Sequence, residues 1–496
     1  MAGIGFALKR MFEKDTFTNR ALAYLYSSFI AAGPWILSVI SINFLLVLMK
    51  LANIPTEERN LFSATIVYSF LFSQVLIAPV QLTVTRYISD KLYNQEYARI
   101  RPTFLGLNKI MFFLSITVCF LFYYNKPLPI YYKLFASYLF IIISMIWVLM
   151  IFLSAVKNYK LIAKAYFFGG ALTLGLIFYF LENPIQFKEL QGASIFLLSY
   201  VIGLSLILVL FLYNFFSTFF YGDKYQYDFF KYLGKFATLG FIGFFYTSGL
   251  WIDNIILWFS DFQETIMGTF TFAPYYDNAV FISYLTTIPT LVLFLVIIET
   301  DFFKAYKLYF ENANSAETFE EIDKAKNKMR GSLNYNLIYT FIFQFLITLT
   351  LILTAKPIFK YFNINYFIRD LFRITSFGAM FNIFAFILIL VLLYFERRGR
   401  ALITAFSFFV LNASFTLYFT TKPLKYTGFG FVIASIITFI LAVIFLKNYL
   451  NQIHYSTFAL QPLYLKDNND IFVRLANNLN ARSEIDIEKM TSEKKI

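Results

Sequence analysis

The chain has 496 residues, of which 59% are hydrophobic and only 14% are charged. Soluble domains do not have this balance, and repeated long apolar runs indicate a polytopic membrane protein. A net charge of +13 would suggest nucleic acid in a soluble protein, but here it indicates basic loops held in the cytoplasm. The single cysteine, Cys119, excludes an intramolecular disulfide and a cysteine zinc cluster. The single histidine, His454, lies beyond the last apolar run, so we expect no His-based metal site and no cofactor.

The first 20 residues predict a short helix at the cytoplasmic membrane interface. Ile4, Leu8, Met11 and Phe12 share one helical face, and basic residues lie elsewhere around the helix. A signal peptide is not expected, because the apolar run that follows comes late, is too long and lacks a cleavage site.

The hydrophobic pattern predicts an all-α membrane protein with twelve spanning helices. Six spans precede Phe236 and six follow it, so we expect two six-helix lobes, an N-lobe at 21–235 and a C-lobe at 236–446. The expected spans are 21–49, 61–88, 103–124, 131–156, 161–181, 192–216, 236–260, 276–299, 333–354, 371–394, 401–420 and 427–446.

The distribution of basic residues predicts the orientation of these spans. With the N-terminus inside, 31 of the 42 Lys and Arg residues lie on the cytoplasmic side, so both termini are expected there. The long loop Thr300–Ser332 contains a capping box, Thr318 to Glu321, which predicts an amphipathic surface helix near 318–330. This helix is either a connector or a docking site. The tail, 447–496, is polar and is expected to be a cytoplasmic surface extension.

The span at 236–260 carries the residue of greatest chemical interest, Asp253. A charge at that depth costs roughly 2.5–3.5 kcal/mol, so it is expected to face a protein cavity or a partner. Ser248, Trp251 and Asn254 lie near it in the sequence. Two hypotheses remain open for Asp253: an ion pair with Arg373, or a carboxylate that lines a substrate path and attracts a cationic sugar.

The span at 276–299 begins with Tyr275, Tyr276, Asp277 and Asn278. Tyrosines beside carboxylates and amides suit sugar binding, because aromatic rings stack on apolar sugar faces while polar groups bind hydroxyls. An aromatic belt at the membrane interface explains the tyrosines equally well. Further polar residues within apolar spans are expected to face inward or to interrupt the helix: Thr286, Thr287, Pro289, Asn382 and Asn412.

The first two spans also contain polar and helix-bending residues. Gly33 and Pro34 are expected to bend the first span, either as a hinge or as a static kink. Asn43 follows and is expected to face inward. Gln74 and Gln81 fall near one face of the second span, where they either line a hydrated path or bond neighbouring helices.

Four stretches of the sequence resemble the PelG family of Pel exopolysaccharide transporters: MAGIGFALKRMF, AAGPW, WIDN and YLTTIPTLVLFLVIIETDFF. The resemblance covers essentially the whole chain. It implies the multidrug/oligosaccharidyl-lipid/polysaccharide flippase fold, with two six-helix lobes around a central cavity. It also implies export of a cationic amino-sugar polymer across the inner membrane, in partnership with a cytoplasmic glycosyltransferase and other Pel membrane components. The family often has a basic residue after the Asp, whereas this chain has Asn254.

Other functions fit the sequence less well. A drug/cation antiporter or a lipid-linked oligosaccharide flippase would share the fold, and Asp253 would serve such an antiporter. A membrane-embedded glycosyltransferase is disfavoured, because the first outer loop offers only Glu57 and Glu58 as an acidic pair and the chain has no nucleotide-binding motif. We therefore expect a transporter that is not an enzyme and does not bind nucleic acid.

Overall fold

The computed structural model describes residues 41–156, 159–183, 192–315, 317–362, 364–459 and 471–481. The chain divides into two compact units. Unit 1 includes Ile252–Gln263 and Phe272–Leu463, and unit 2 includes Pro34–Trp251, Glu264–Thr271 and Tyr464–Ile496. The division falls within one helix, α9 (Ala237–Leu257), so this helix carries the chain from unit 2 into unit 1.

Unit 2 is a helical bundle with α5 at its centre. Helix α5 packs against α3, α4 and α7, and α6 packs against α7. The wholly buried residues Leu149, Phe152 and Leu153 lie on α5, as expected for a helix surrounded by others. The helices of this unit, besides the helical residues Ser41–Leu51, are α3 (Thr56–Tyr93), η1 (Tyr97–Arg99), α4 (Ile100–Tyr123), α5 (Ile130–Val156), α6 (Tyr159–Glu182), α7 (Ala193–Thr218) and α8 (Phe229–Lys235).

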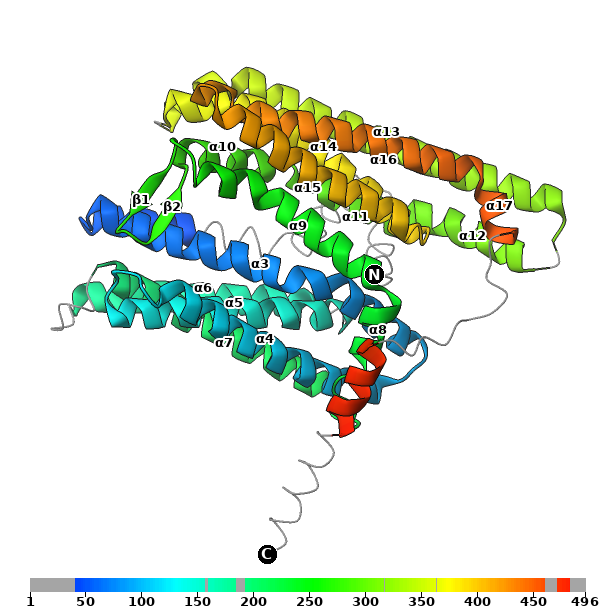
Figure 1. The fold of residues 1–496 in the computed structure, drawn as a ribbon, viewed down its shortest axis with the longest axis horizontal. Coiled ribbons are helices and arrows are strands. Elements are labelled where there is room, and N and C mark those ends of the chain that lie inside the picture. The colour runs from blue at the N-terminus through cyan, green and yellow to red at the C-terminus, as the bar shows by residue number, and fades with distance from the viewer. Residues whose placement is uncertain are drawn as a thin grey trace, which may run out of the picture. The chain divides into compact units, whose positions relative to one another are not determined.

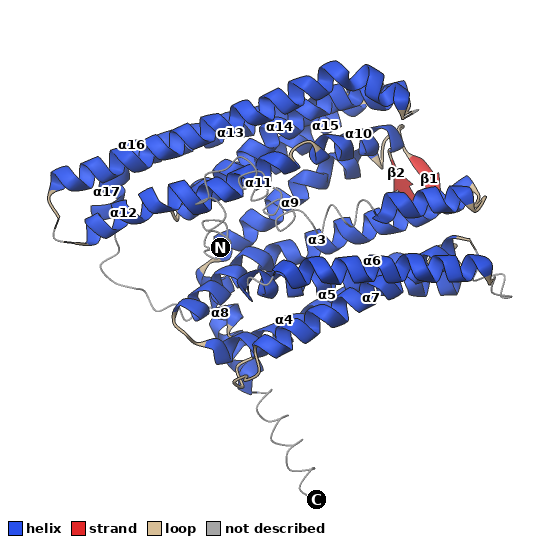
Figure 2. Cartoon of the chain, turned by 180° about the vertical axis from the view of Figure 1, so that it is seen from behind, coloured by secondary structure: helices blue, strands red, loops and turns tan. Residues whose placement is uncertain are grey.

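A short β-hairpin follows α9 and was not predicted from the sequence. Strands β1 (Glu264–Ile266) and β2 (Phe270–Phe272) pair across a turn, and they form the only sheet among the described residues (Figure 2). Met267 and Gly268 both adopt positive φ, at 44° and 60°. Tight hairpin turns favour glycine at such positions because it has no Cβ.

Unit 1 is organised around α14, which packs against α10, α13, α15 and α16 (Figure 1). Glycines permit close helix approach here: a Cβ on Gly378 would meet the Phe431 ring, and one on Gly430 would meet the backbone of Thr416. The elements after β2 are α10 (Pro274–Leu285), α11 (Ile288–Ile297), η3 (Ile298–Phe302), α12 (Phe303–Asn314), α13 (Phe319–Tyr361), α14 (Tyr366–Tyr394), α15 (Arg398–Thr420), η4 (Leu424–Tyr426), α16 (Gly428–Asn451) and α17 (Ile453–Phe458).

The expected span 276–299 is divided into α10 and α11, as its polar residues indicated. Thr286 and Thr287 donate their hydroxyls to the carbonyls of Ser283 and Tyr284, at 2.7 and 2.8 Å. Pro289 lies in the first turn of α11, where its missing N–H costs nothing. The threonines and the proline together end one helix and start the next.

The predicted surface helix at 318–330 is longer than expected. Its capping box is present, with Thr318 and Glu321 bonding each other's backbone N–H. However, the helix continues without a break into the expected span 333–354, forming the 43-residue α13. Gly331 is the only strong helix-weakening residue at the junction, and one glycine costs only about 1 kcal/mol. At 1.5 Å per residue α13 is about 64 Å long, roughly twice the thickness of a bilayer core.

The tail, which was predicted to be a surface extension, contains a helix at residues 471–481. These residues form a helix that belongs to unit 2, in which Ala476 is fully buried and Asn480 is 5% exposed. The hydrophobic pattern does not mark this helix, because a small alanine and an amide, rather than large apolar side chains, are its buried residues.

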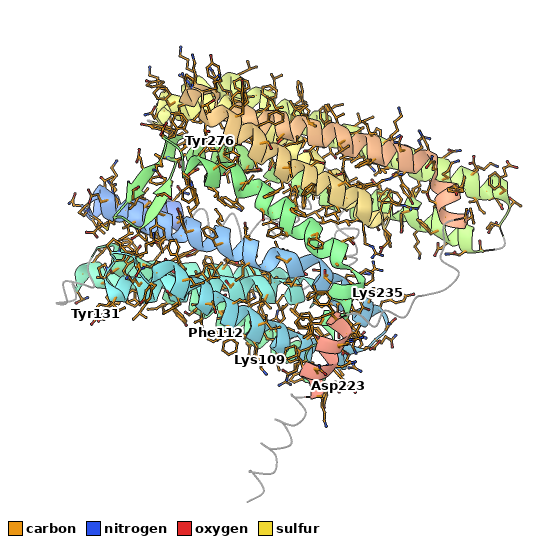
Figure 3. The ribbon with its side chains drawn as sticks, in the orientation of Figure 1. Lys109, Phe112, Tyr131, Asp223, Lys235 and Tyr276 are labelled. Carbon is orange, nitrogen blue, oxygen red and sulfur yellow. The ribbon has the colours of Figure 1, made fainter. Side chains whose placement is uncertain are left out.

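Eleven helical segments among the described residues are long and apolar enough to span a membrane. The first expected span, 21–49, lies mostly outside the described residues, as does the predicted helix at 1–20. Many large apolar side chains on these helices are exposed, for example Phe112 on α4 and Tyr131 on α5 (Figure 3). Exposed aromatics on apolar helices are typical of a surface that faces lipid.

Candidate functional site

The carboxylate of Asp253 lies buried in unit 1, near the end of α9. Its exposed fraction is 1%, and Oδ2 accepts a hydrogen bond of 2.6 Å from the Tyr276 hydroxyl. The Asn412 side chain, on α15, also interacts with this carboxylate. The other oxygen, Oδ1, is buried and has no hydrogen-bond partner among the described residues. A buried carboxylate oxygen without a hydrogen-bond partner is costly, so this environment disfavours the charged form of Asp253.

Asp277 has a different environment, one turn into α10. Its Oδ1 accepts from Asn254 Nδ2 at 2.7 Å, and its Oδ2 accepts from Trp258 Nε1 at 2.8 Å and from the backbone N–H of Ala273 at 3.0 Å. Ala273 is the N-cap of α10, so the carboxylate also lies where the helix dipole favours negative charge. Both oxygens of Asp277 are therefore occupied, and this carboxylate fastens α9 to the start of α10.

Adjacent residues in sequence make these contacts on both helices. Asp253 and Asn254 lie on α9, and Tyr276 and Asp277 lie on α10; Figure 3 marks Tyr276 near the start of α10. Each helix supplies one carboxylate and one neutral donor, so the two hydrogen bonds cross from helix to helix in both directions. Pro274 begins α10 and thereby fixes the position of Tyr276 and Asp277.

Neither carboxylate has a basic partner within the part of the chain that the structure describes. The groups that act on Asp253 and Asp277 are tyrosine, tryptophan, amides, backbone N–H groups and the other carboxylate. The structure does not contain the hypothesised pair of Asp253 with Arg373: no arginine is among the groups that act on Asp253, and the Arg373 Nε is buried without a hydrogen-bond partner among the described residues. Arg373 lies on α14, a helix that packs against α10, and it forms no ion pair with Asp253 or Asp277 in the described part of the chain.

The other predicted residues are distributed over both units. Asn382 and Asn412 are buried in unit 1, with exposed fractions of 1% and 0%, as inward-facing amides should be. Tyr275 packs edge-to-face on Phe367, at 5.8 Å between ring centroids. Tyr275 therefore has a packing role in unit 1. Tyr276 has a different role, because its hydroxyl donates a hydrogen bond to Asp253.

Five predicted residues belong to unit 2. Trp251 donates its Nε1 to the Gln74 Oε1 at 3.3 Å, which joins α9 to α3. Ser248 has a buried hydroxyl without a hydrogen-bond partner, while Gln81 and Asn43 are exposed. Gln74 is half-buried whereas Gln81 is exposed, so the two amides have different environments, and the inward orientation of Asn43 stays a prediction. The expected hinge, Gly33 and Pro34, lies outside the described residues.

Sequence reasoning missed Trp258 as a member of the site. Its side chain is 2% exposed, and a buried indole N–H requires an acceptor. The signal was present, since Trp258 follows Asn254 by one helical turn and these two residues bond the same carboxylate. Among the described residues, no group of three or more His, Cys, Asp or Glu side chains could hold a metal ion.

Comparisons with known proteins agree with this architecture. The family model for PelG, an exopolysaccharide exporter family (EPS-E), matches residues 1–458. A comparison with curated proteins finds no match. The chain is similar in fold to a MATE transporter solved in complex with MaL6, with a TM-score of 0.59, 11% identity, and coverage of 86% of this chain and 96% of that one.

Two further solved structures are similar to the chain. One is the outward-facing conformation of a multidrug resistance MATE family transporter of the MOP superfamily, with a TM-score of 0.58, 14% identity, and coverage of 87% and 96%. The other is a MOP superfamily transporter from Pyrococcus furiosus, with a TM-score of 0.55, 14% identity, and coverage of 86% and 95%. The two-lobed transporter fold expected from the span pattern is confirmed. The chain belongs to the PelG family of exopolysaccharide exporters, and it is a multi-pass membrane protein with the fold of MOP-superfamily transporters.

Proposed function

We propose that this chain exports a cationic amino-sugar exopolysaccharide across the cytoplasmic membrane, and that Asp253 is a contact for the polymer. The observation that carries the proposal is a carboxylate buried in an apolar span with one oxygen unpartnered and no basic neighbour among the described residues. A protonated amine supplies both the missing hydrogen bond and the missing positive charge. Attraction between such groups is strong in a low-dielectric passage, and a single carboxylate still allows a polymer to move on.

The two carboxylates have separate roles in this proposal. Asp277 holds the N-terminus of α10 to α9 through its three donors, while Asp253 keeps Oδ1 for the substrate. Tyr276 positions the Asp253 side chain by its 2.6 Å hydrogen bond. The cluster contains no nucleophile and base pair, and we assign no catalytic step to it.

The orientation in the membrane is part of the proposal. Both termini lie in the cytoplasm, on the distribution of Lys and Arg described above. Reporter fusions at Lys157, Asp228, Glu320 and the C-terminus should read cytoplasmic, and a fusion at Phe262 should read external. An external signal at Glu320 would contradict the two-lobed topology.

A partner on the cytoplasmic side is also proposed, because the described chain has no domain that would make the polymer. The start of α13 is the docking surface we favour, together with Met1–Arg20: Phe319 is 69% exposed next to the capping box. Charge reversal at Lys324 and Lys328 should reduce recovery of a glycosyltransferase with the purified protein. Unchanged recovery after both substitutions would rule out this surface.

The function is tested by polymer secretion in cells that carry Asp253→Asn. We expect secretion to fall at least about tenfold while the amount of inserted protein stays normal, because the amide has no charge with which to attract the amine. Asp261→Asn is the matched control: Asp261 is exposed beyond the end of α9 and should leave secretion unchanged. Normal secretion by Asp253→Asn would exclude Asp253 from the substrate path. Export of a neutral lipid-linked oligosaccharide or of a cationic drug, instead of the polymer, would favour the alternative functions of this fold.

A further inference from the structure

Two tryptophan side chains of unit 2 are held by adjacent residues of α3. Trp147 on α5 donates its Nε1 to the Ser73 hydroxyl at 3.1 Å, and Trp251 on α9 donates its Nε1 to the Gln74 Oε1 at 3.3 Å. Both tryptophans are half-buried. A hydrogen bond at one edge fixes the orientation of each indole, while part of its surface stays accessible.

The two acceptors on α3 differ in what they leave free. The Ser73 hydroxyl is buried, and it donates to the Phe70 carbonyl at 3.0 Å while it accepts from Trp147. Gln74 is half-buried, and its Oε1 accepts from Trp251. The Gln74 Nε2 has no hydrogen-bond partner in the described part of the chain and is not enclosed by it. Since an amide nitrogen carries two N–H groups, Gln74 has two donors to offer.

The depth of Gln74 indicates what these donors meet. Gln74 lies near the middle of the expected span 61–88. Lipid tails have no acceptor for an amide, so a polar side chain at this depth faces a protein group, water or a ligand. The described residues supply no acceptor for Nε2, which leaves water or a polar ligand. Secondary transporters bind their substrates near the midplane of the bilayer.

Close packing of α9 on α3 holds the indole and the amide together. A Cβ on Gly243 would meet the Ala78 carbonyl oxygen, so only glycine lets the two backbones approach this closely. Trp251 lies about two turns beyond Gly243 on α9, and Gln74 lies about one turn before Ala78 on α3. The pair of Trp251 and Gln74 is therefore built on two helices in backbone contact.

We propose that Trp251 and Gln74 form a sugar subsite in unit 2, which binds a neutral, N-acetylated unit of the polymer. The proposal rests on the proposed export function. The accessible indole face stacks on the apolar face of the sugar ring, and the Gln74 N–H groups donate to a hydroxyl or to the acetamido oxygen. Neither side chain is charged, so this subsite takes the sugar units that have no amine to interact with Asp253.

Binding of a short, fully N-acetylated oligosaccharide to the detergent-purified full-length protein tests the subsite. Gln74→Met removes both donors and Trp251→Leu removes the ring, so each should raise the Kd about tenfold. Trp147→Leu is the matched control and should leave the Kd unchanged, because the acceptor of this indole, Ser73, has no free donor. An unchanged Kd in Gln74→Met, or no binding to the wild-type protein, would overturn the proposal.

Gln74→Glu separates loss of the subsite from damage to the fold. A carboxylate still accepts from the Trp251 indole, but it has no N–H to donate and it attracts an amine. The Kd of the N-acetylated oligosaccharide should rise, and that of the deacetylated, cationic form should fall. A rise for both forms would overturn the proposal, because damage to the fold acts on both.

The subsite and the export function can fail separately. Asp253→Asn should leave the Kd of the N-acetylated form unchanged, since this form has no amine, and a tenfold rise would overturn the separate subsite. Failure of the role proposed for Asp253 in export would appear instead as normal polymer secretion by Asp253→Asn.

Discussion

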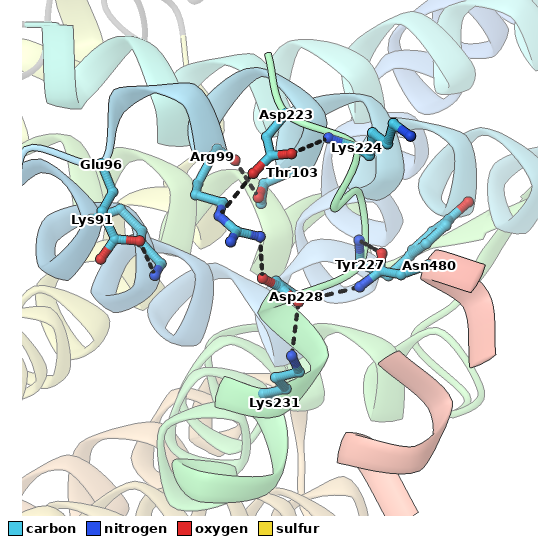
Figure 4. A network of polar contacts seen from close by, with 10 residues as sticks. All are labelled: Lys91, Glu96, Arg99, Thr103, Asp223, Lys224, Tyr227, Asp228, Lys231 and Asn480. Carbon is cyan, nitrogen blue, oxygen red and sulfur yellow. Dashed lines mark hydrogen bonds and ion pairs between the residues drawn. The ribbon is translucent and has the colours of Figure 1, made fainter. Parts of the chain in front are cut away.

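Aspartate carboxylates have opposite environments in two regions of the molecule. Asp253 and Asp277 in unit 1 have no cationic partner among the described residues, whereas Asp223 and Asp228 in unit 2 form ion pairs with Arg99. Asp228, in the segment between α7 and α8, contacts the cations of Arg99 and Lys231 and the amide of Asn480, and its side chain is 12% exposed (Figure 4). Asp253 is 1% exposed, has a tyrosine and an amide beside it, and leaves one oxygen unpartnered. A carboxylate with cationic partners stabilises the fold, whereas one without them at membrane depth costs stability, which is the reason we propose a substrate role for Asp253.

Asp277 lies between these two extremes, since it is half-buried without a cation yet has hydrogen bonds on both carboxylate oxygens. This makes Asp277→Ala the change with the largest expected effect on folding. It leaves the N–H groups of Trp258, Asn254 and Ala273 without an acceptor, which should cost about 3 kcal/mol or more. Thermal unfolding of the detergent-purified protein measures the loss, with the exposed Asp261→Ala as control. Equal unfolding temperatures in the two variants would show that Asp277 is not structural.

Arg99→Lys, next to Asp223 and Asp228 in unit 2, should have an intermediate effect on stability. Lysine keeps the charge but cannot reach Asp223 and Asp228 together or stack flat on Tyr225. We expect the free energy of unfolding to fall by about 1–2 kcal/mol. The measurements are a lower unfolding temperature of unit 2 and faster amide hydrogen exchange in residues 219–228. Arg369→Lys, whose pair with the adjacent Asp370 is local, should change neither quantity.

The smallest stability effect should come from Asp253→Asn. The amide still accepts from Tyr276 and no longer carries a buried charge, so the unfolding free energy should change by less than about 1 kcal/mol. The same unfolding measurement made for Asp277→Ala checks this value. A loss as large as that of Asp277→Ala would remove the distinction between the two carboxylates.

Much of the fold could be predicted because membrane spans are long and strongly apolar. The break at Thr286 and Thr287 was also predictable, since hydroxyls and a proline compete directly with helix bonding. The continuity of α13 was not, because a capping box marks where a helix begins and nothing in the sequence marks its length. The hairpin turn at Met267 has no strong sequence signal apart from Gly268.

The candidate site was only partly predictable. Asp253 was recognisable because a carboxylate stands out in an apolar span, and Tyr276 and Asp277 because they begin the next one. Their pairing depends on how α9 and α10 face each other, which the sequence does not determine. For the same reason Arg373 was a reasonable partner for Asp253 by its depth in the membrane, although no ion pair joins the two residues.

Binding of a short amino-sugar oligosaccharide to the detergent-purified protein tests the central claim most directly. Wild-type protein should bind the fully deacetylated, cationic oligosaccharide more tightly than its N-acetylated counterpart. In Asp253→Asn this preference should be lost, with the Kd for the cationic form raised about tenfold or more, which corresponds to about 1.4 kcal/mol. The same Kd in wild-type and Asp253→Asn protein, with the preference for the cationic form intact, would contradict the assignment of Asp253 to the substrate path.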